Sequence, residues 1–201
     1  GVKAIVIACN TSSSWALPTL RRYFKVPIIG VIRPGARAAV QAPTKKRVGV
    51  IGTEATIRSR AYEMEIKRLD RSIAVTSQSC PLFVPMVESG FNGPLSTQIA
   101  ATYLEPLKRQ RIDTLILGCT HYPLLASVIQ RAIGPQVTLV DSATQTAAEV
   151  KGLLAWNEWL SSKSQRPQYR FFVTDEPDHF ARLGQQFLGQ RIRSVERVSN
   201  R

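Results

Sequence analysis

The sequence predicts an α/β protein with mostly parallel sheets that are flanked by helices. Short apolar runs of strand length alternate with amphipathic stretches, at steps of roughly 20–30 residues. Such alternation is typical of parallel strands joined by right-handed helical crossovers. Two of the apolar runs also end alike, because a cysteine follows each run and a threonine stands within two residues of that cysteine.

The strands are predicted from apolar runs that stop at glycine, proline or polar residues. The clearest run stops at Gly118, and a thiol, a hydroxyl and an imidazole follow at once. A run of this composition is typical of a strand that is buried on both faces of a sheet. The expected strands cover residues 3–8, 27–32, 48–52, 73–76, 112–117, 136–140, 169–173 and 192–195. Residues 82–87 are expected to form a loop or a strand, and residues 161–168 a polar loop.

The helices are predicted from amphipathic stretches that begin at a capping residue or a proline. Ser12 or Ser13 can cap the first helix, and Thr53 and Asp141 can cap two later ones. Glu54 suits the dipole at the start of the helix that follows Thr53. The expected helices cover residues 12–24, 36–41, 53–69, 94–109, 123–133, 141–159 and 178–188.

Two breaks in this pattern predict the domain organisation. Arg33-Pro34-Gly35 interrupts an apolar run and is a candidate crossing into a second domain, and Asp141-Ser142 is a candidate return. We therefore expect a first α/β domain made of residues 1–32 and 143–201. Residues 33–142 are expected to form the second α/β domain.

The composition is that of an ordinary globular protein without disulfides or metal. Of the 201 residues, 44% are hydrophobic and 20% are charged, which is enough to bury a core. Three cysteines form no C-x-x-C pair, and His121 lies far from His179, so neither a disulfide framework nor a metal site is predicted. No signal peptide or membrane-spanning apolar run is found, so the expected compartment is a reducing cytoplasm.

The net charge of +13 is spread along the chain rather than gathered in one run. A solvated basic surface is the simpler explanation of this spread. The alternative is attraction to acidic partners, either anionic metabolites or nucleic acid. No zinc-finger or aromatic RNA-binding signature is present, so neither nucleic acid nor a membrane is predicted as a partner.

Cys9 and Cys119 are the candidate reactive residues. Each stands where a predicted strand ends, and ligands of α/β sheets bind at the carboxyl ends of the strands. A helix N-terminus lowers the pKa of a cysteine from its usual value of about 8.5, so both are expected to form thiolates readily. The hydroxyls of Thr11 and Thr120 and nearby backbone N–H groups could hold a carboxylate. Cys80 has no helix start after it and is expected to be a small buried apolar residue.

Several motifs, in order along the chain, resemble those of bacterial glutamate racemases, and the similarity extends over essentially the whole sequence. The resemblance implies two pseudo-symmetric α/β domains with the active site in the cleft between them. It also implies a racemase that needs no cofactor and supplies D-glutamate for peptidoglycan. One thiolate removes the Cα proton and the other thiol protonates the opposite face, which requires two groups in opposite protonation states. The matching motifs are Ala8-Cys9-Asn10-Thr11, Val31-Ile32-Arg33-Pro34-Gly35-Ala36, Gly52-Thr53 with Thr56 and Ser59, Leu117-Gly118-Cys119-Thr120-His121-Tyr122-Pro123-Leu124, and Val140-Asp141-Ser142.

The resemblance also implies roles for individual residues. Cys9 and Cys119 match the two bases, His121 matches the partner of the second cysteine, and Glu88 matches an acidic residue near the cleft. His121 could instead be a capping or core histidine, and Glu88 an ordinary loop carboxylate. Groups that bind the amino and carboxylate ends of the substrate are matched by Asn10, Thr11, Thr53 and Thr120.

The family begins with a strand that ends in Asp-Ser-Gly, and a later Tyr-Gly pair closes over the substrate. Neither precedes Cys9 in the 201 residues. The family's Asp assists the first cysteine and its Ser binds substrate. We therefore expect the 201 residues alone to be nearly inactive and to expose apolar sheet surface.

Two other functions stay open at this point. A related aspartate racemase would use the same chemistry on a shorter substrate. A non-catalytic basic regulator, such as an inhibitor of DNA gyrase, would instead bind DNA in a salt-dependent manner. The family is often dimeric, which makes a homodimer a candidate assembly.

Overall fold

The computed structural model of the protein describes residues 1–42, 46–91, 93–162 and 167–199. The chain forms two compact units, Gly1–Leu160 and Ser161–Arg201. All the residues singled out above as candidate site residues lie in the first unit. The strands within each sheet are parallel and helices flank the sheets, so the predicted α/β fold class is confirmed.

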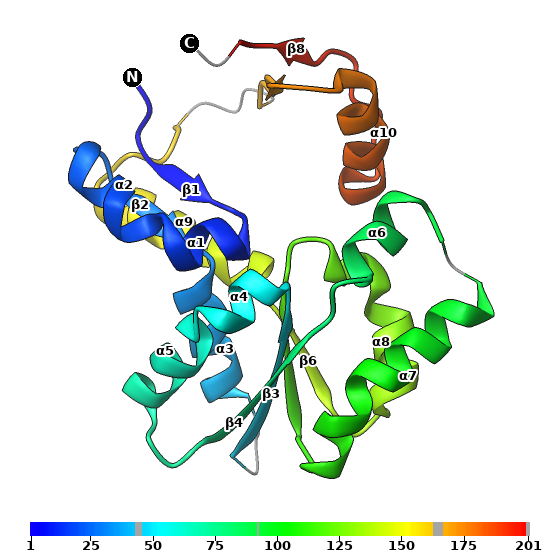
Figure 1. The fold of residues 1–201 in the computed structure, drawn as a ribbon. Helices are drawn as coiled ribbons and strands as arrows, with labels where there is room; N and C mark the ends of the chain where they lie inside the picture. The colour runs from blue at the N-terminus through cyan, green and yellow to red at the C-terminus, as the bar shows by residue number, and fades with distance from the viewer. Residues whose placement is uncertain (43–45, 92, 163–166, 200–201) are drawn as a thin grey trace. The chain divides into compact units, whose positions relative to one another are not determined.

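A four-stranded parallel sheet forms the centre of the first unit (Figure 1). Its order is β4-β3-β5-β6, and the paired ends of β3 and β5 bring Gly52 opposite Gly118. Its carboxyl ends therefore meet at one edge, where the residues after Gly52 and Gly118 gather. The strands are β3 (Arg47–Gly52), β4 (Ala74–Ser79), β5 (Thr114–Gly118) and β6 (Thr138–Asp141).

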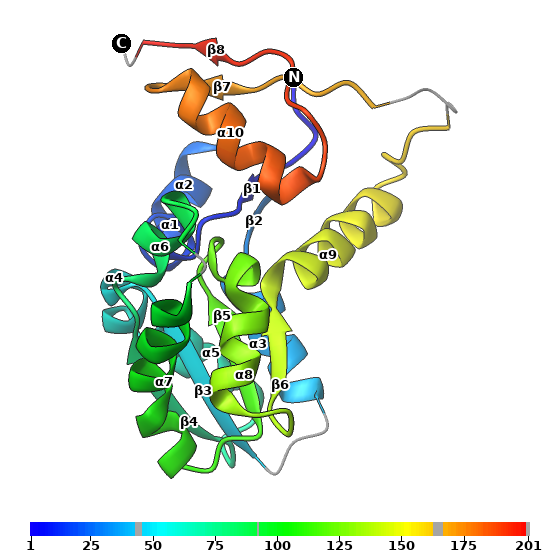
Figure 2. The same ribbon diagram turned by 90° about the vertical axis from the view of Figure 1, so that its right-hand side faces the viewer.

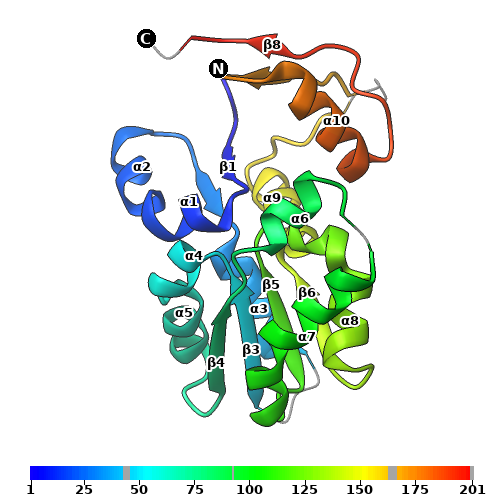
Figure 3. The same ribbon diagram turned by 45° about the vertical axis from the view of Figure 1, so that its right-hand side comes forward.

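Helices cover both faces of this sheet, and the side chains of β5 point alternately to the two faces. Ile116 packs in one apolar cluster with α3 (Ile32–Gln41) and α5 (Ala61–Leu69). Leu115 and Leu117 pack in the other cluster with α7 (Pro94–Arg109) and α8 (Ala126–Ile133). Figure 3 shows these layers from a turned view. Three short helices stand near the carboxyl ends of the strands: α4 (Glu54–Arg58), α6 (Phe83–Glu88) and the 3₁₀ helix η1 (Tyr122–Leu125).

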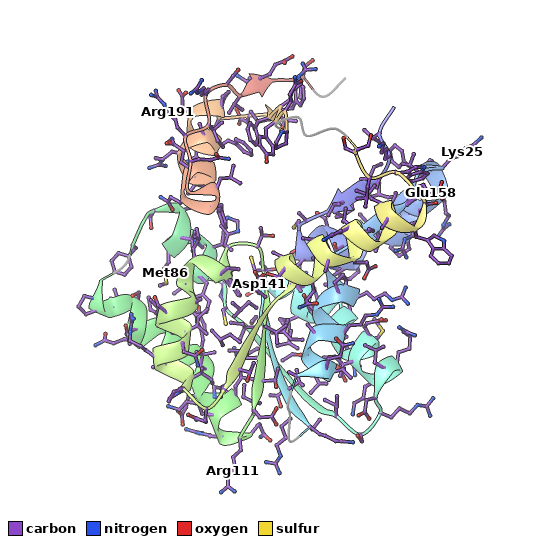
Figure 4. The ribbon with its side chains drawn as sticks, turned by 180° about the vertical axis from the view of Figure 1, so that it is seen from behind. Lys25, Met86, Arg111, Asp141, Glu158 and Arg191 are labelled. Atoms are coloured by element: carbon purple, nitrogen blue, oxygen red, sulfur yellow. The ribbon has the colours of Figure 1, made fainter. Side chains whose placement is uncertain are left out.

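A second, two-stranded parallel sheet carries the first cysteine. It pairs β1 (Ile5–Ile7) with β2 (Ile28–Gly30), and α1 (Asn10–Trp15) and α2 (Leu17–Tyr23) connect the two strands (Figure 2). The last helix of the unit, α9 (Ser142–Trp156), starts directly after Asp141 and packs against α3 and β2 (Figure 4). Val6 on β1 is 42% exposed, and Trp156 at the end of α9 is exposed as well.

The second unit, Ser161–Arg201, has one helix and two short strands among its described residues. β7 (Phe172–Val173) pairs in parallel with β8 (Glu196–Arg197), and α10 (Pro177–Leu188) lies between them in sequence. The helix ends at Gly189, whose φ of +63° is the left-handed conformation that glycine favours at this position. Phe171 contacts the ring of Phe180, with 5.9 Å between the ring centroids.

Several predicted elements differ from the structure. Residues 82–87, expected as a loop or strand, lie largely within α6. Ser12 and Ser13 lie inside α1, whose N-cap is Cys9, so the predicted serine cap is wrong. Arg33-Pro34-Gly35 does not end a strand but forms part of the start of α3, because proline suits the first turn of a helix. The last strand is 196–197 rather than 192–195.

Two predicted long helices are each divided in the structure. The helix expected over 53–69 consists of α4 and α5, separated at Arg60, which has a left-handed φ of +54°. The helix expected over 12–24 consists of α1 and α2, which meet at Ala16. Thr53 and Asp141 do cap the helices that follow them, through side-chain oxygens that accept backbone N–H groups. All four strands of the central sheet lie within residues 33–142, and the predicted domain bounds stay a prediction.

No helix among the described ranges is both long enough and apolar enough to span a membrane.

Candidate active site

Cys9 and Cys119 stand at the ends of β1 and β5, as the sequence predicts. Cys9 is exposed and holds the N-cap position of α1 in an extended conformation. Cys119 is 7% exposed and precedes η1. The hydroxyl of Thr120 donates a hydrogen bond of 3.0 Å to the carbonyl oxygen of Ala8. This bond joins the residue after one cysteine to the residue before the other, so the two strand ends meet.

Gly118 allows β5 to reach this position. A Cβ atom at Gly118 would lie 2.5 Å from the Ile51 carbonyl oxygen and 3.2 Å from the ring of Tyr62. The first distance is too short for any side chain, because the obstacle is backbone in the neighbouring strand. A residue other than glycine would therefore displace the strand end that carries Cys119.

The Cys119 thiol is held in its protonated form. Burial raises the pKa of Cys119 to about 11, and the backbone N–H groups of His121 and Tyr122, which hydrogen-bond the sulfur, oppose this only in part. The charges of Cys9 and Glu88 raise the pKa further. The predicted ready formation of a thiolate is therefore wrong for the resting Cys119. The physical reason is that only one 3₁₀ turn follows it, while the surrounding core removes water.

Cys119, His121 and Glu88 contact one another in series. The Cys119 Sγ lies 3.8 Å from His121 Nδ1, and His121 Nε2 lies 3.2 Å from Glu88 Oε1. A carboxylate can only accept, so Nε2 is the donor toward Glu88, and Nδ1 faces the thiol. Glu88 is the last residue of α6, and the fold brings it to His121 across 33 positions of sequence. The arrangement can take a proton from Cys119 and return it.

Three threonine hydroxyls form a cluster beside α4. The Thr11 hydroxyl lies 2.9 Å from that of Thr53 and 3.0 Å from that of Thr56, and Thr53 and Thr56 are also 3.0 Å apart. Thr11 belongs to α1, Thr53 is the N-cap of α4 and Thr56 lies within α4, so the cluster joins the part that carries Cys9 to the central sheet that carries Cys119. Thr56 was not among the predicted site residues. Its place in the matching motif, three residues after the capping Thr53, is the signal that could have found it.

Asn10, the residue after Cys9, is buried and held by a tyrosine. The Tyr62 hydroxyl donates a 2.8 Å hydrogen bond to Asn10 Oδ1 across 52 positions of sequence. Tyr62 lies in the middle of an amphipathic stretch, where the sequence pattern predicts only a core residue. No sequence signal could have found this contact.

Cys80 lies in the apolar core and is fully buried. Burial raises the pKa of its thiol to about 12. This environment agrees with the expected role as a small apolar residue. Among the residues that the structure describes, no group of three or more His, Cys, Asp or Glu side chains is placed to hold a metal ion.

The fold and this arrangement together define a class: an α/β protein in which two strand ends each present a cysteine beside hydroxyl groups. The chain belongs to the Asp/Glu/Hydantoin racemase family, whose model matches residues 1–150. The resemblance predicted from the motifs is therefore confirmed.

Relatives of known sequence and structure agree with this assignment. A glutamate racemase of Geobacter metallireducens is 46% identical over 199 residues, which cover 98% of this chain and 74% of the relative. A glutamate racemase of Francisella tularensis, solved in complex with D-glutamate, matches with a TM-score of 0.91 and 39% identity, over 98% of this chain and 74% of that one. A glutamate racemase isoform of Bacillus anthracis gives a TM-score of 0.89 at 42% identity, with the same two coverages.

Proposed function

We propose that the protein interconverts L-glutamate and D-glutamate by transferring protons between the substrate Cα and two cysteines, Cys9 and Cys119, with no cofactor. The observation that carries this proposal is the meeting of two cysteine-bearing strand ends, joined by the bond from Thr120 to Ala8. The family assignment and the glutamate racemases among the relatives support the choice of reaction. D-Glutamate is a building block of peptidoglycan, so the product would serve cell-wall synthesis.

The reaction needs one thiolate and one thiol at the same time, on opposite sides of the carbon. Burial keeps Cys119 protonated, which suits it to donate a proton to the carbanionic intermediate. Cys9, as the opposed group, removes the substrate proton in that direction. In the reverse direction Cys119 must first lose its proton, and His121 Nδ1 is the acceptor beside it. Glu88 holds the imidazole in the tautomer that this transfer requires.

Asn10, Thr11, Thr53 and Thr120 are proposed to bind the charged ends of the substrate. The threonine cluster supplies hydroxyls that can donate to a carboxylate, and their mutual hydrogen bonds keep them together before substrate arrives. Pre-organised donors near a substrate carboxylate stabilise the charge that develops when the Cα proton leaves. Thr56 completes the cluster. The net charge of +13 favours the approach of an anionic substrate.

The family resemblance further supports a homodimer that works in the cytoplasm. Light scattering of the purified protein measures the assembly: a mass of twice the 22.3 kDa chain supports the dimer, and the mass of one chain contradicts it.

Circular dichroism of the amino acid tests the proposed reaction. L-Glutamate and D-glutamate are incubated separately with the 201 residues preceded by a strand that ends in Asp-Ser-Gly, because the 201 residues alone are expected to be nearly inactive, and no cofactor is added. Both solutions should lose optical activity and reach the same racemic end point. L-Aspartate and D-aspartate are run in parallel, and faster loss of the aspartate signal would assign the protein to aspartate instead. If neither amino acid changes, the proposed function is wrong.

A further inference from the structure

Tyr62 on α5 contacts a residue next to each of the two cysteines. Its hydroxyl donates to Asn10 Oδ1 at 2.8 Å, next to Cys9. Its ring lies under Gly118, next to Cys119, where a Cβ atom would be 3.2 Å from Tyr62 Cε2. Tyr62 is 3% exposed and lies outside the matching motifs, whereas Asn10 and Gly118 lie inside them. It is therefore a structural link between the two strand ends of the site.

The hydrogen bonds of Tyr62 have a fixed direction. Burial raises the pKa of Tyr62, so its phenol keeps its proton, and the Ser142 side chain also lies within hydrogen-bonding reach of the phenol. The phenol donates this proton to Asn10 Oδ1 at 2.8 Å. A Cβ atom at Gly35 would lie 3.0 Å from the Tyr62 Oη and 3.1 Å from Ser142 Cβ, so the absence of a side chain there leaves room for this chain of bonds.

This direction determines which end of the Asn10 amide is available. The carbonyl end accepts from Tyr62, so the NH₂ end is the part that can serve another partner. Turning the amide over would replace the oxygen that accepts from Tyr62 by an NH₂ group, and this hydrogen bond would be lost. Asn10 is 2% exposed, so an unsatisfied arrangement would be costly and the observed orientation is favoured.

We propose that Tyr62 is a positioning residue of the racemase: through its hydrogen bond it fixes the Asn10 amide with the NH₂ group toward a carboxylate of the substrate. The inference rests on the proposed function, because it needs glutamate as the ligand beside Cys9. It assigns a role to a helix residue that touches no reacting atom. A tyrosine that merely filled the core would contribute to folding alone.

Tyr62→Phe tests this role, because it removes the hydroxyl and keeps the ring under Gly118. We expect kcat/KM for both glutamate enantiomers to fall by about five- to tenfold, as for loss of one orienting hydrogen bond. Thr146→Val is the matched control. Thr146 is also buried and donates one hydrogen bond, 2.7 Å long, to the backbone carbonyl oxygen of Ser142, so its replacement leaves the Ser142 side chain and the bond from Tyr62 to Asn10 in place. Its kcat/KM should stay within about twofold of the parent.

A double-mutant cycle shows whether Tyr62 acts through Asn10. In an Asn10→Ala background, Tyr62→Phe should change kcat/KM and the Kd for D-glutamate by less than about twofold. In the same background, the effect of Thr146→Val on kcat/KM should simply add to that of Asn10→Ala. If Tyr62→Phe causes its full loss in the absence of the Asn10 amide, it acts independently of Asn10 and the proposal is overturned.

Asn10→Asp tests the donor role of the amide. The new carboxylate can still accept from Tyr62, but it offers no donor and repels a substrate carboxylate. Its kcat/KM should be at least as low as that of Asn10→Ala. Activity near that of the parent would mean that Asn10 serves the ammonium end of the substrate, and the proposed orientation would be wrong.

The outcomes separate this inference from the proposed function. A parent protein that includes the Asp-Ser-Gly strand, yet neither binds nor converts glutamate by calorimetry and circular dichroism, refutes both. An active parent with a Tyr62→Phe variant equal to Thr146→Val refutes the role of Tyr62 alone. If Tyr62→Phe does not fold, Ser142→Ala carries the same test, because it frees the phenol to rotate. Ser142→Ala should lower kcat/KM by less than Tyr62→Phe, and this loss should disappear in the Asn10→Ala background. A loss that persists in that background would overturn the proposal.

Discussion

Alkylation of Cys119 should be slow at neutral pH and should accelerate steeply with pH. A thiol with a pKa of about 11 is ionised to about one part in a thousand at pH 8, whereas an ordinary thiol of pKa about 8.5 is about one quarter ionised. The higher pKa makes the thiolate roughly tenfold more nucleophilic, which leaves a net deficit of about twentyfold. Burial of the sulfur lowers the rate further. Cys119 should therefore react with iodoacetamide at least about twentyfold more slowly than free cysteine at pH 8.

Timed labelling followed by mass spectrometry of the peptides measures each cysteine separately. Between pH 8 and pH 10 the Cys119 rate should rise about tenfold for each pH unit. Cys80, which is fully buried, is the internal control and should stay unlabelled while the protein is folded. Glu88→Gln removes a negative charge that raises the pKa of Cys119, so this variant should label faster at pH 8. A Cys119 rate that reaches its plateau at or below pH 9 would refute the assignment of Cys119 as the protonated group.

Three further predictions follow from the same structure. Cys9→Ala and Cys119→Ala should each slow racemisation at least about a hundredfold, the usual contribution of a general acid or base, while Cys80→Ala should keep nearly parental turnover. Because burial raises the pKa of Cys119 to about 11, the folded state retains a proton that the unfolded chain loses. Stability should therefore fall between about pH 9 and pH 11, by up to roughly 1.4 kcal/mol per pH unit from this thiol. Urea unfolding at the two pH values should show a smaller decline for Cys119→Ala than for the parent. The charge of +13 should give only weak DNA binding, lost between about 50 and 200 mM salt, and tight sequence-specific binding would instead favour a regulator.

Strands β3 and β5 of the central sheet were predictable because their apolar runs are continuous and end in glycine. β3 and β5 end at Gly52 and Gly118, as the pattern indicates. The helix α6 was missed because Phe83–Glu88 is short, almost wholly apolar and contains Pro85, so it shows no helical period. Division of the helix after Thr53 depends on Arg60 in a left-handed conformation, which no local rule anticipates.

The site residues that follow strand ends were predictable from the sequence. The properties and contacts that depend on tertiary packing were not. Cys9 and Cys119 stand beside hydroxyls in sequence, so their pattern is visible. The raised pKa of Cys119 was not predictable, because it comes from burial in a core built of distant helices. The contact from Tyr62 to Asn10 joins α5 to α1, and only the folded chain brings these residues together.

Incorporation of solvent deuterium is the sharpest test of the two-cysteine mechanism. L-Glutamate is incubated in D₂O with protein that carries this sequence, and both enantiomers are separated at low conversion and analysed by NMR. Cys9 and Cys119 exchange their thiol protons with solvent, so one removes protium and the other delivers deuterium. The newly formed D-glutamate should carry deuterium at Cα while the remaining L-glutamate keeps its protium. Deuterium that enters L-glutamate as fast as D-glutamate forms would indicate a single base, and it would contradict opposed roles for the two cysteines.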